Sequence, residues 1–141
     1  MDRRELNPTD LDSTGLRALL GNPDPLGVLS IFADAGTDAR RTATEIHNRL
    51  AQLDSSLADE GPPQRSAAFR ETVGRIRADL ERLRVPGASG RGRVLFASLS
   101  GRPPLRLSTR LRLPNRVVLD DRPFIHPLLE RSRRDARPAS S

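Results

Sequence analysis

Two adjacent acids and a histidine near the C-terminal end of the chain are candidates for chemistry: Asp120, Asp121 and His126. Paired carboxylates raise one another's pKa, and a nearby imidazole can serve as a general base, so these residue types suit a hydrolytic site. Neighbouring residues of a strand point to opposite faces, however, and acids before a helix commonly cap its free N–H groups. We therefore expect Asp120 and Asp121 to cap a helix that begins near Pro123, and His126 to be a partly buried packing residue.

These acids belong to a segment that we interpret as a structural joint between a strand and a helix. A hydrolase that acts through these acids and His126 is the least favoured interpretation. The joint comprises Asp120, Asp121, Arg122, Pro123 and Phe124.

Other catalytic and metal chemistry finds little support in the sequence. The chain has no cysteine, which excludes disulfides, thiolate metal ligands and cysteine nucleophiles. The second histidine, His47, has no histidine or carboxylate four residues further along its predicted helix, so a metal pair is not formed there. No serine lies in a nucleophile elbow. We predict no catalytic residue, no metal and no cofactor.

Arginine is the most informative residue type, because it supplies all 24 basic side chains. Residues 1–64 hold six arginines and eleven acids, whereas residues 65–141 hold eighteen arginines and seven acids. Between Arg82 and Arg116 there are nine arginines and no acid. Such a one-sided basic block favours a phosphate-rich partner such as RNA.

Within this block, residues 105–113 alternate strictly between apolar and polar side chains, as in a strand with one wet face. That face would carry Ser108 and three arginines, with successive outward residues about 7 Å apart. No aromatic residue accompanies them, so contact with a nucleic-acid backbone is favoured over base reading. An exposed strand whose arginines prevent edge-to-edge aggregation remains the alternative. The predicted RNA-binding residues are Arg91, Arg93, Arg102, Arg106, Arg110, Arg112 and Arg116.

The remaining pattern predicts one α/β (α+β) domain at residues 10–130, between a disordered N-terminus (1–9) and a disordered Arg/Ser tail (131–141). A small mixed sheet of about four strands packs against an antiparallel helical hairpin, with short N- and C-terminal helices. Helices are expected at about 10–21, 40–58 and 63–84 and after Pro123, and strands at 27–33, 93–100, 105–113 and 115–120.

The sequence gives no sign of a membrane segment. No run of 18 apolar residues occurs, and the first residues lack the apolar core of a signal peptide. We expect a cytoplasmic protein without a membrane partner; its oligomeric state is not indicated.

Three segments taken together carry a resemblance to a known family: residues 25–34 (PLGVLSIFAD), 92–97 (GRVLFA) and 113–129 (LPNRVVLDDRPFIHPLL). They resemble the N-terminal domain of the bacterial members of the archaeo-eukaryotic release factor family, whose relatives end translation by hydrolysing peptidyl-tRNA. The resemblance covers roughly residues 16–130. It implies a ribosome- or tRNA-docking domain, since the first domain of that family contacts the decoding region of the ribosome.

The same resemblance implies that this chain is not itself an enzyme. In that family a second domain carries a hydrolytic Gly-Gly-Gln loop, and this chain has no Gly-Gly dipeptide. Members that read stop codons have an Asn-Ile-Lys-Ser loop between the hairpin helices. Here residues 58–64 are acidic and lack lysine, so codon reading is not expected.

Two alternatives remain open. The hairpin at residues 40–84 could present a face to another protein, such as a separate chain that carries the missing domains. The polar tail after Arg131 also suits a truncated gene product with no independent role.

Overall fold

The structure is a computed structural model that describes residues 4–6, 17, 21, 23–34, 38–84, 92–110 and 112–127. The described elements form a mixed α/β domain, as predicted. In chain order they are β1 (Arg4–Leu6), β2 (Val28–Asp34), α2 (Ala39–Glu60), α3 (Pro63–Arg75), α4 (Arg77–Arg82), β3 (Gly92–Ser98), β4 (Leu105–Thr109) and β5 (Arg116–Asp120).

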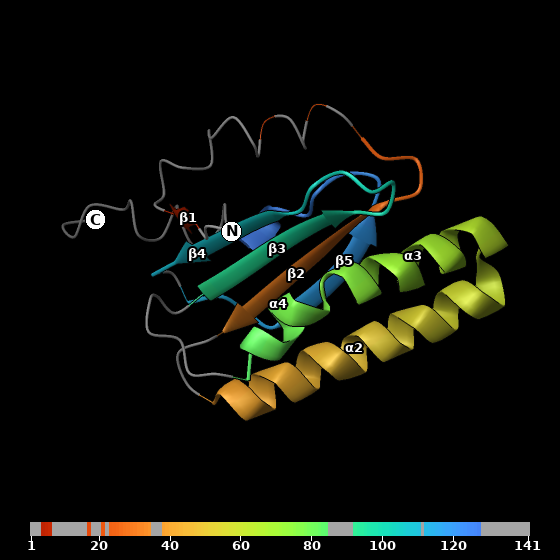
Figure 1. The fold of residues 1–141 in the computed structure, drawn as a ribbon. Helices are drawn as coiled ribbons and strands as arrows, with labels where there is room; N and C mark the ends of the chain where they lie inside the picture. Colours follow the sequence, from red (N-terminus) through yellow and green to blue (C-terminus); the bar gives the residue numbers. More distant parts are fainter. Residues whose placement is uncertain are drawn as a thin grey trace.

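A five-stranded sheet in the order β1-β4-β3-β2-β5 forms the centre of the domain (Figure 1). β2 pairs antiparallel with β3 on one side and with β5 on the other, so Ile31 lies between Leu95 and Val117. β2 is buried on both faces from Val28 to Ala33, which agrees with the nearly continuous apolar run of its sequence.

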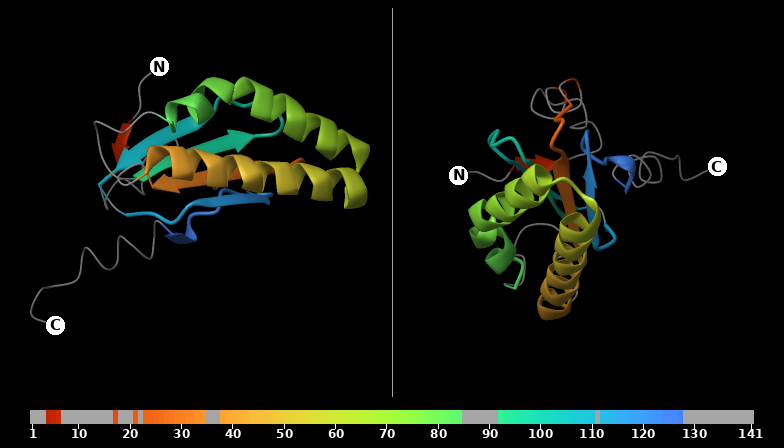
Figure 2. Two further views of the ribbon diagram at one scale, coloured as in Figure 1. Left: turned by 90° about the horizontal axis from the view of Figure 1, so that it is seen from below. Right: turned by 90° about the vertical axis from the view of Figure 1, so that its right-hand side faces the viewer.

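The three helices cover one face of this sheet, which we call the helical face (Figure 2). Leu29 and Ile31 of β2 and Leu95 of β3 pack there against Leu50 of α2 and Phe69 of α3. The opposite face buries a second cluster that includes Val28, Phe32, Phe96, Leu107 and Leu113.

The helical hairpin confirms the prediction from apolar spacing. Asp38 caps α2, because its carboxylate accepts a hydrogen bond from the backbone N–H of Arg41 at 3.1 Å. Gly61 and Pro62 separate α2 from α3. The single helix predicted over residues 63–84 is wrong, however, because it is interrupted at Ile76.

Two features explain that interruption. Gly74 favours helix weakly, and the hydroxyl of Thr72 donates to the carbonyl of Ala68, an interaction that bends helices. The break buries Ile76 and lets α4 lie over the sheet with Asp79 directed toward β4.

β4 departs from its prediction in length and in exposure. It ends at Thr109 instead of Leu113, because the chain must then cross the opposite face to reach β5 beyond β2. The expected wet face is also wrong, because Arg106 and Ser108 lie on the helical face; Ser108 is buried, and the Arg106 side chain is 11% exposed.

The prediction of disorder for residues 1–9 is wrong for Arg4–Leu6. These residues form β1, which pairs parallel with β4, with Arg4 opposite Leu107 and Leu6 opposite Thr109. β4 is therefore an internal strand of the described sheet, so the alternative interpretation, in which its arginines protect an open edge from aggregation, does not apply. The tail at residues 131–141 and most of both predicted terminal helices lie outside the described residues.

The chain between β4 and β5 is fixed to both layers by Asn115. Its side-chain oxygen accepts a hydrogen bond from the backbone N–H of Asp34 at 2.8 Å, and its side-chain nitrogen donates to Glu45 of α2 at 2.9 Å. After β5, the backbone N–H of Phe124 donates to the hydroxyl of Ser30 at 2.9 Å, which brings the Phe124 ring against Phe32. This segment closes the opposite face of the sheet.

The predicted capping role of Asp120 and Asp121 is wrong. The first helical residue after β5 is His126, too far along the chain for either carboxylate to occupy its N-cap position. The Asp120 carboxylate instead accepts a hydrogen bond from the backbone N–H of Asp121 at 2.8 Å. The joint at residues 120–124 thus turns the chain without starting a helix.

No helix in the described part of the chain is long and apolar enough to span a membrane.

Candidate nucleic-acid interface

A groove of about 330 Å³ lies between the α3–α4 junction and the turn that joins β3 to β4. Arg75, Arg102 and Arg106 line it, together with Thr72, Pro103 and Pro104 among others. None of the described residues that line this groove is acidic. Three guanidiniums around one concave surface favour an anionic ligand.

The helix α3 and the β3–β4 turn together position Arg75. Its guanidinium donates a hydrogen bond to the Thr72 hydroxyl at 3.0 Å. Another of its nitrogens would lie 3.2 Å from a Cβ at Gly101, whose φ of +93° favours glycine. Glu71 is only 3.9 Å from Arg75 but its side chain is 74% exposed, so it neutralises Arg75 weakly. Arg75 is therefore a cation held at the rim of the groove.

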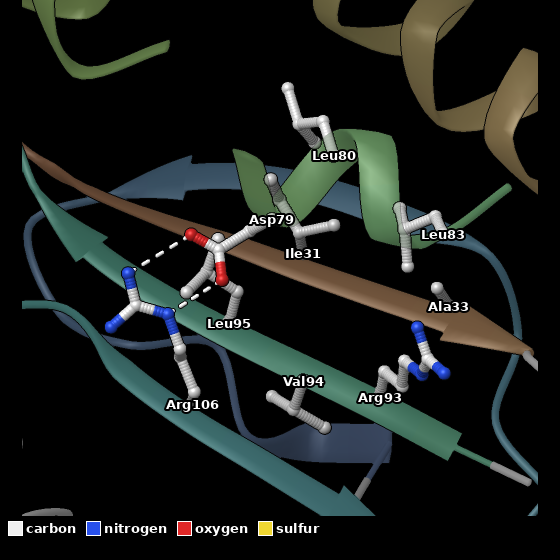
Figure 3. Close-up of a pocket in the computed structure, with 9 residues that line it drawn as sticks. All are labelled: Ile31, Ala33, Asp79, Leu80, Leu83, Arg93, Val94, Leu95 and Arg106. Carbon is white, nitrogen blue, oxygen red and sulfur yellow. Dashed lines mark hydrogen bonds and ion pairs between the residues drawn. The ribbon is translucent and has the colours of Figure 1, made fainter. Parts of the chain in front are cut away.

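Arg106 is the third arginine that lines the groove. It is committed to a structural ion pair with Asp79, which Figure 3 shows. Its guanidinium makes two hydrogen bonds to Asp79 of α4, at 2.6 and 3.0 Å, and the two side chains are only 11% and 9% exposed. The hydrogen bond to Asp79 raises the pKa of Arg106. The predicted outward orientation of Arg106 is therefore wrong, and its ion pair with Asp79 neutralises its charge.

Arg93 lies on the same face of the sheet as Arg106, beside a cavity of about 20 Å³ under α4 (Figure 3). Its guanidinium donates a hydrogen bond to the carbonyl of Arg82 at 2.9 Å. Burial lowers the pKa of Arg93, and the neighbouring charge of Arg82 lowers it further. Arg93 thus anchors the C-terminal end of α4 to β3.

Asp24 fixes the turn that carries Arg102. This fully buried carboxylate accepts hydrogen bonds from the backbone N–H groups of Leu26 and Ser100 and from the hydroxyls of Ser98 and Ser100. Burial raises the pKa of Asp24, but these hydrogen bonds outweigh it, the Ser100 hydroxyl foremost, and hold the pKa at about 2. Arg102, half-buried on this turn, donates to the carbonyl of Pro23 at 3.5 Å.

None of the other described arginines that were predicted to bind RNA lines this groove. Arg110 and Arg112 are exposed on the connection after β4. Arg116 is exposed on β5, where its guanidinium lies 5.6 Å from the centre of the Phe124 ring on the opposite face. Arg91 lies outside the described residues.

The acids and histidines considered for catalysis are all on the surface. Asp120, Asp121, His126 and His47 are exposed, and the His126 ring centre lies 6.2 Å from that of Phe124. The predicted burial of His126 is therefore wrong. Among the described residues, no cluster of three or more histidine, aspartate or glutamate side chains could hold a metal ion.

Sequence reasoning missed Arg75, which lines the groove, and Asp79, which pairs with the groove residue Arg106. Arg75 stands on the polar side of a regular amphipathic helix, and only its spacing of three from Thr72 hints at the hydrogen bond between them. Asp79 is the single acid between Glu71 and Glu81, and nothing in that spacing points to Arg106.

No family model matches the sequence, and no curated protein matches it. Among solved structures, the chain is similar to one described only as an archaeal protein, with a TM-score of 0.62 and 19% sequence identity. The match covers 91% of this chain and 36% of the archaeal chain, so this chain spans little more than a third of that protein's length. At this identity the similarity shows a shared fold.

Proposed function

We propose that this chain is a non-catalytic, cytoplasmic RNA-docking domain that binds the ribosome or tRNA, like the N-terminal module of a bacterial release-factor-like protein. The observation that carries the proposal is the acid-free groove lined by Arg75, Arg102 and Arg106. Arg75 and Arg102 supply its charge toward a ligand, because Asp79 neutralises Arg106. Exposed Arg110 and Arg112 add positive charge that favours a phosphate backbone.

The architecture supports the same proposal. A helical hairpin on a small sheet is the fold that the resemblance to the release factor family implies. The similar archaeal protein is longer, and only 36% of it matches, which suits a module that occurs within larger proteins. The apolar stripe of the hairpin is buried against the sheet. The hairpin therefore supports a protein-binding role less well than the groove supports RNA binding.

Sedimentation with ribosomes at low salt tests this function. Arg75→Glu combined with Arg102→Glu should weaken binding at least about tenfold, because two phosphate contacts become repulsive. The control is Arg40→Glu with Arg49→Glu, which makes the same charge change at exposed positions of α2. Equal binding by both double variants would contradict the proposal.

Arg106 is unsuitable for this test, since a carboxylate there would face Asp79 in a buried site and unfold the domain. Repeating the sedimentation at rising salt distinguishes phosphate contact from an apolar interaction. Binding should fall steeply with salt for the wild type and less steeply for the groove variant. A salt-independent interaction would instead favour a protein partner.

A further inference from the structure

β5 is an edge strand whose second side is not used by the sheet. It follows β2 at one end of the strand order, and the described residues place no strand on its other side (Figure 1). Such an edge presents unpaired N–H and C=O groups that can pair with another strand. β5 carries Arg116, Val117, Val118, Leu119 and Asp120; the two charged ends are exposed and the three apolar residues between them are half-buried.

The charges on β5 are arranged to match a second copy of the same strand. We propose that two copies of this chain associate by antiparallel pairing of their β5 strands around a two-fold axis at Val118. That axis places Arg116 of each copy opposite Asp120 of the other, and Val117 opposite Leu119. Both ends of the new ladder thus carry unlike charges, and its centre is apolar.

The faces of the two sheets also match in this arrangement. Val117 and Leu119 pair with Ile31 and Leu29 on the helical face, where both are only half-buried. A two-fold axis perpendicular to the sheet keeps the helices of both copies on one side of the sheet. Val117 of each copy therefore contacts Leu119 of the other copy on that side. The result is a continuous ten-stranded sheet.

Neighbouring registers are less favourable. Moving the axis to Leu119 sets Arg116 opposite Arg122 of the second copy, which are like charges. Moving it to Val117 sets Asp120 opposite Pro114, which has no N–H to donate. The register at Val118 alone pairs the whole strand with complementary charges.

Charge exchange tests the proposal by sedimentation of the full chain over a concentration series. The wild-type mass should rise with concentration from one chain toward two. In a dimer of Arg116→Asp, positions 116 and 120 of both copies are acidic, and in a dimer of Asp120→Arg all four are basic. Because like charges then face each other, each variant should raise the dissociation constant about tenfold or more. An equimolar mixture of the two variants restores both unlike pairs and should form the mixed dimer.

Arg112→Asp is the control, because it changes the charge equally at an exposed residue outside β5 and should leave association unchanged. Far-UV circular dichroism checks that every variant is folded, and the two single variants provide independent tests if one is not. A wild type that stays monomeric throughout, or single variants that do not pair when mixed, would overturn the proposal. If Arg112→Asp weakened association as much as the β5 variants do, the effect would be one of general charge, and this result would also overturn the proposal.

Discussion

Asp24 and Asp79 are both buried carboxylates, yet the domain stabilises them in opposite ways. Asp24 accepts hydrogen bonds from backbone N–H groups and serine hydroxyls, all of them neutral donors. Asp79 is paired with the charged guanidinium of Arg106. Removing Asp24 leaves neutral donors unsatisfied, whereas removing Asp79 leaves a buried charge without its counterion. The partner left behind, more than the carboxylate itself, therefore sets the cost of substitution.

The largest effect is expected at Asp79. Asp79→Leu should lower the free energy of unfolding by about 3 to 4 kcal/mol, because Arg106 is left buried and charged. Chemical denaturation measures this loss. Asp79→Leu combined with Arg106→Leu should recover most of it, since the buried charge is also removed. A double variant as unstable as the single one would show that the pair itself is the source of stability.

Asp24→Ala should cost somewhat less, about 2 to 3 kcal/mol, because the donors that lose their acceptor are neutral. The same denaturation experiment measures it. No single compensating substitution should restore the loss, because the donors come from Leu26, Ser98 and Ser100. Recovery by Ser98→Ala alone would contradict this account and make the Ser98 contact dominant.

The effect of acid on the stabilisation by Asp24 follows from the pKa of this carboxylate. The folded state holds this pKa at about 2, below the ordinary 3.8, so the stabilisation is complete above about pH 4 and is lost as the pH falls toward 2. The loss amounts to about 2 kcal/mol. Denaturation at pH 5 and pH 2 should show it in the wild type, and Asp24→Asn should reduce that difference by the same amount.

The half-buried carboxylate of Asp54, at the surface, should give the smallest effect, with which the losses at Asp79 and Asp24 can be compared. Asp54 accepts a hydrogen bond from Arg70 at 3.0 Å between α2 and α3, where the two side chains are 35% and 63% exposed. Asp54→Ala should change the free energy of unfolding by less than about 1 kcal/mol, because water and salt screen the pair. A loss as large as that at Asp79 would mean that this contact fixes the hairpin.

Periodicity was enough to predict the main elements of the fold. The apolar run of β2 and the regular spacing of Ile46, Leu50 and Leu57 correspond to buried positions in the structure. These signals are local, because one buried face leaves a repeating pattern within a few turns of chain. β1 had no such pattern over three residues, and only its pairing with β4 defines it.

The candidate site was predictable only in composition. The arginine-rich block contains Arg102 and Arg106, which line the groove, but alternation along β4 could not tell which face the helices cover. Arg106 looks solvent-exposed in sequence because its partner Asp79 is 27 residues away on another element. A buried ion pair across such a distance leaves no periodic trace, and Arg75 joins the groove only through the packing of α3 against the β3–β4 turn.

The central place of β2 has a consequence for the order in which the chain is synthesised. Val28 pairs with Asp120, which lies 92 residues later in the chain. One edge of β2 therefore stays unpaired until almost the whole domain has been synthesised. Until then Val28–Ala33 is an apolar strand with an open edge, a segment prone to aggregation. A chain that stops before Arg116 would keep that edge permanently, and chaperone binding or precipitation would be its expected fate.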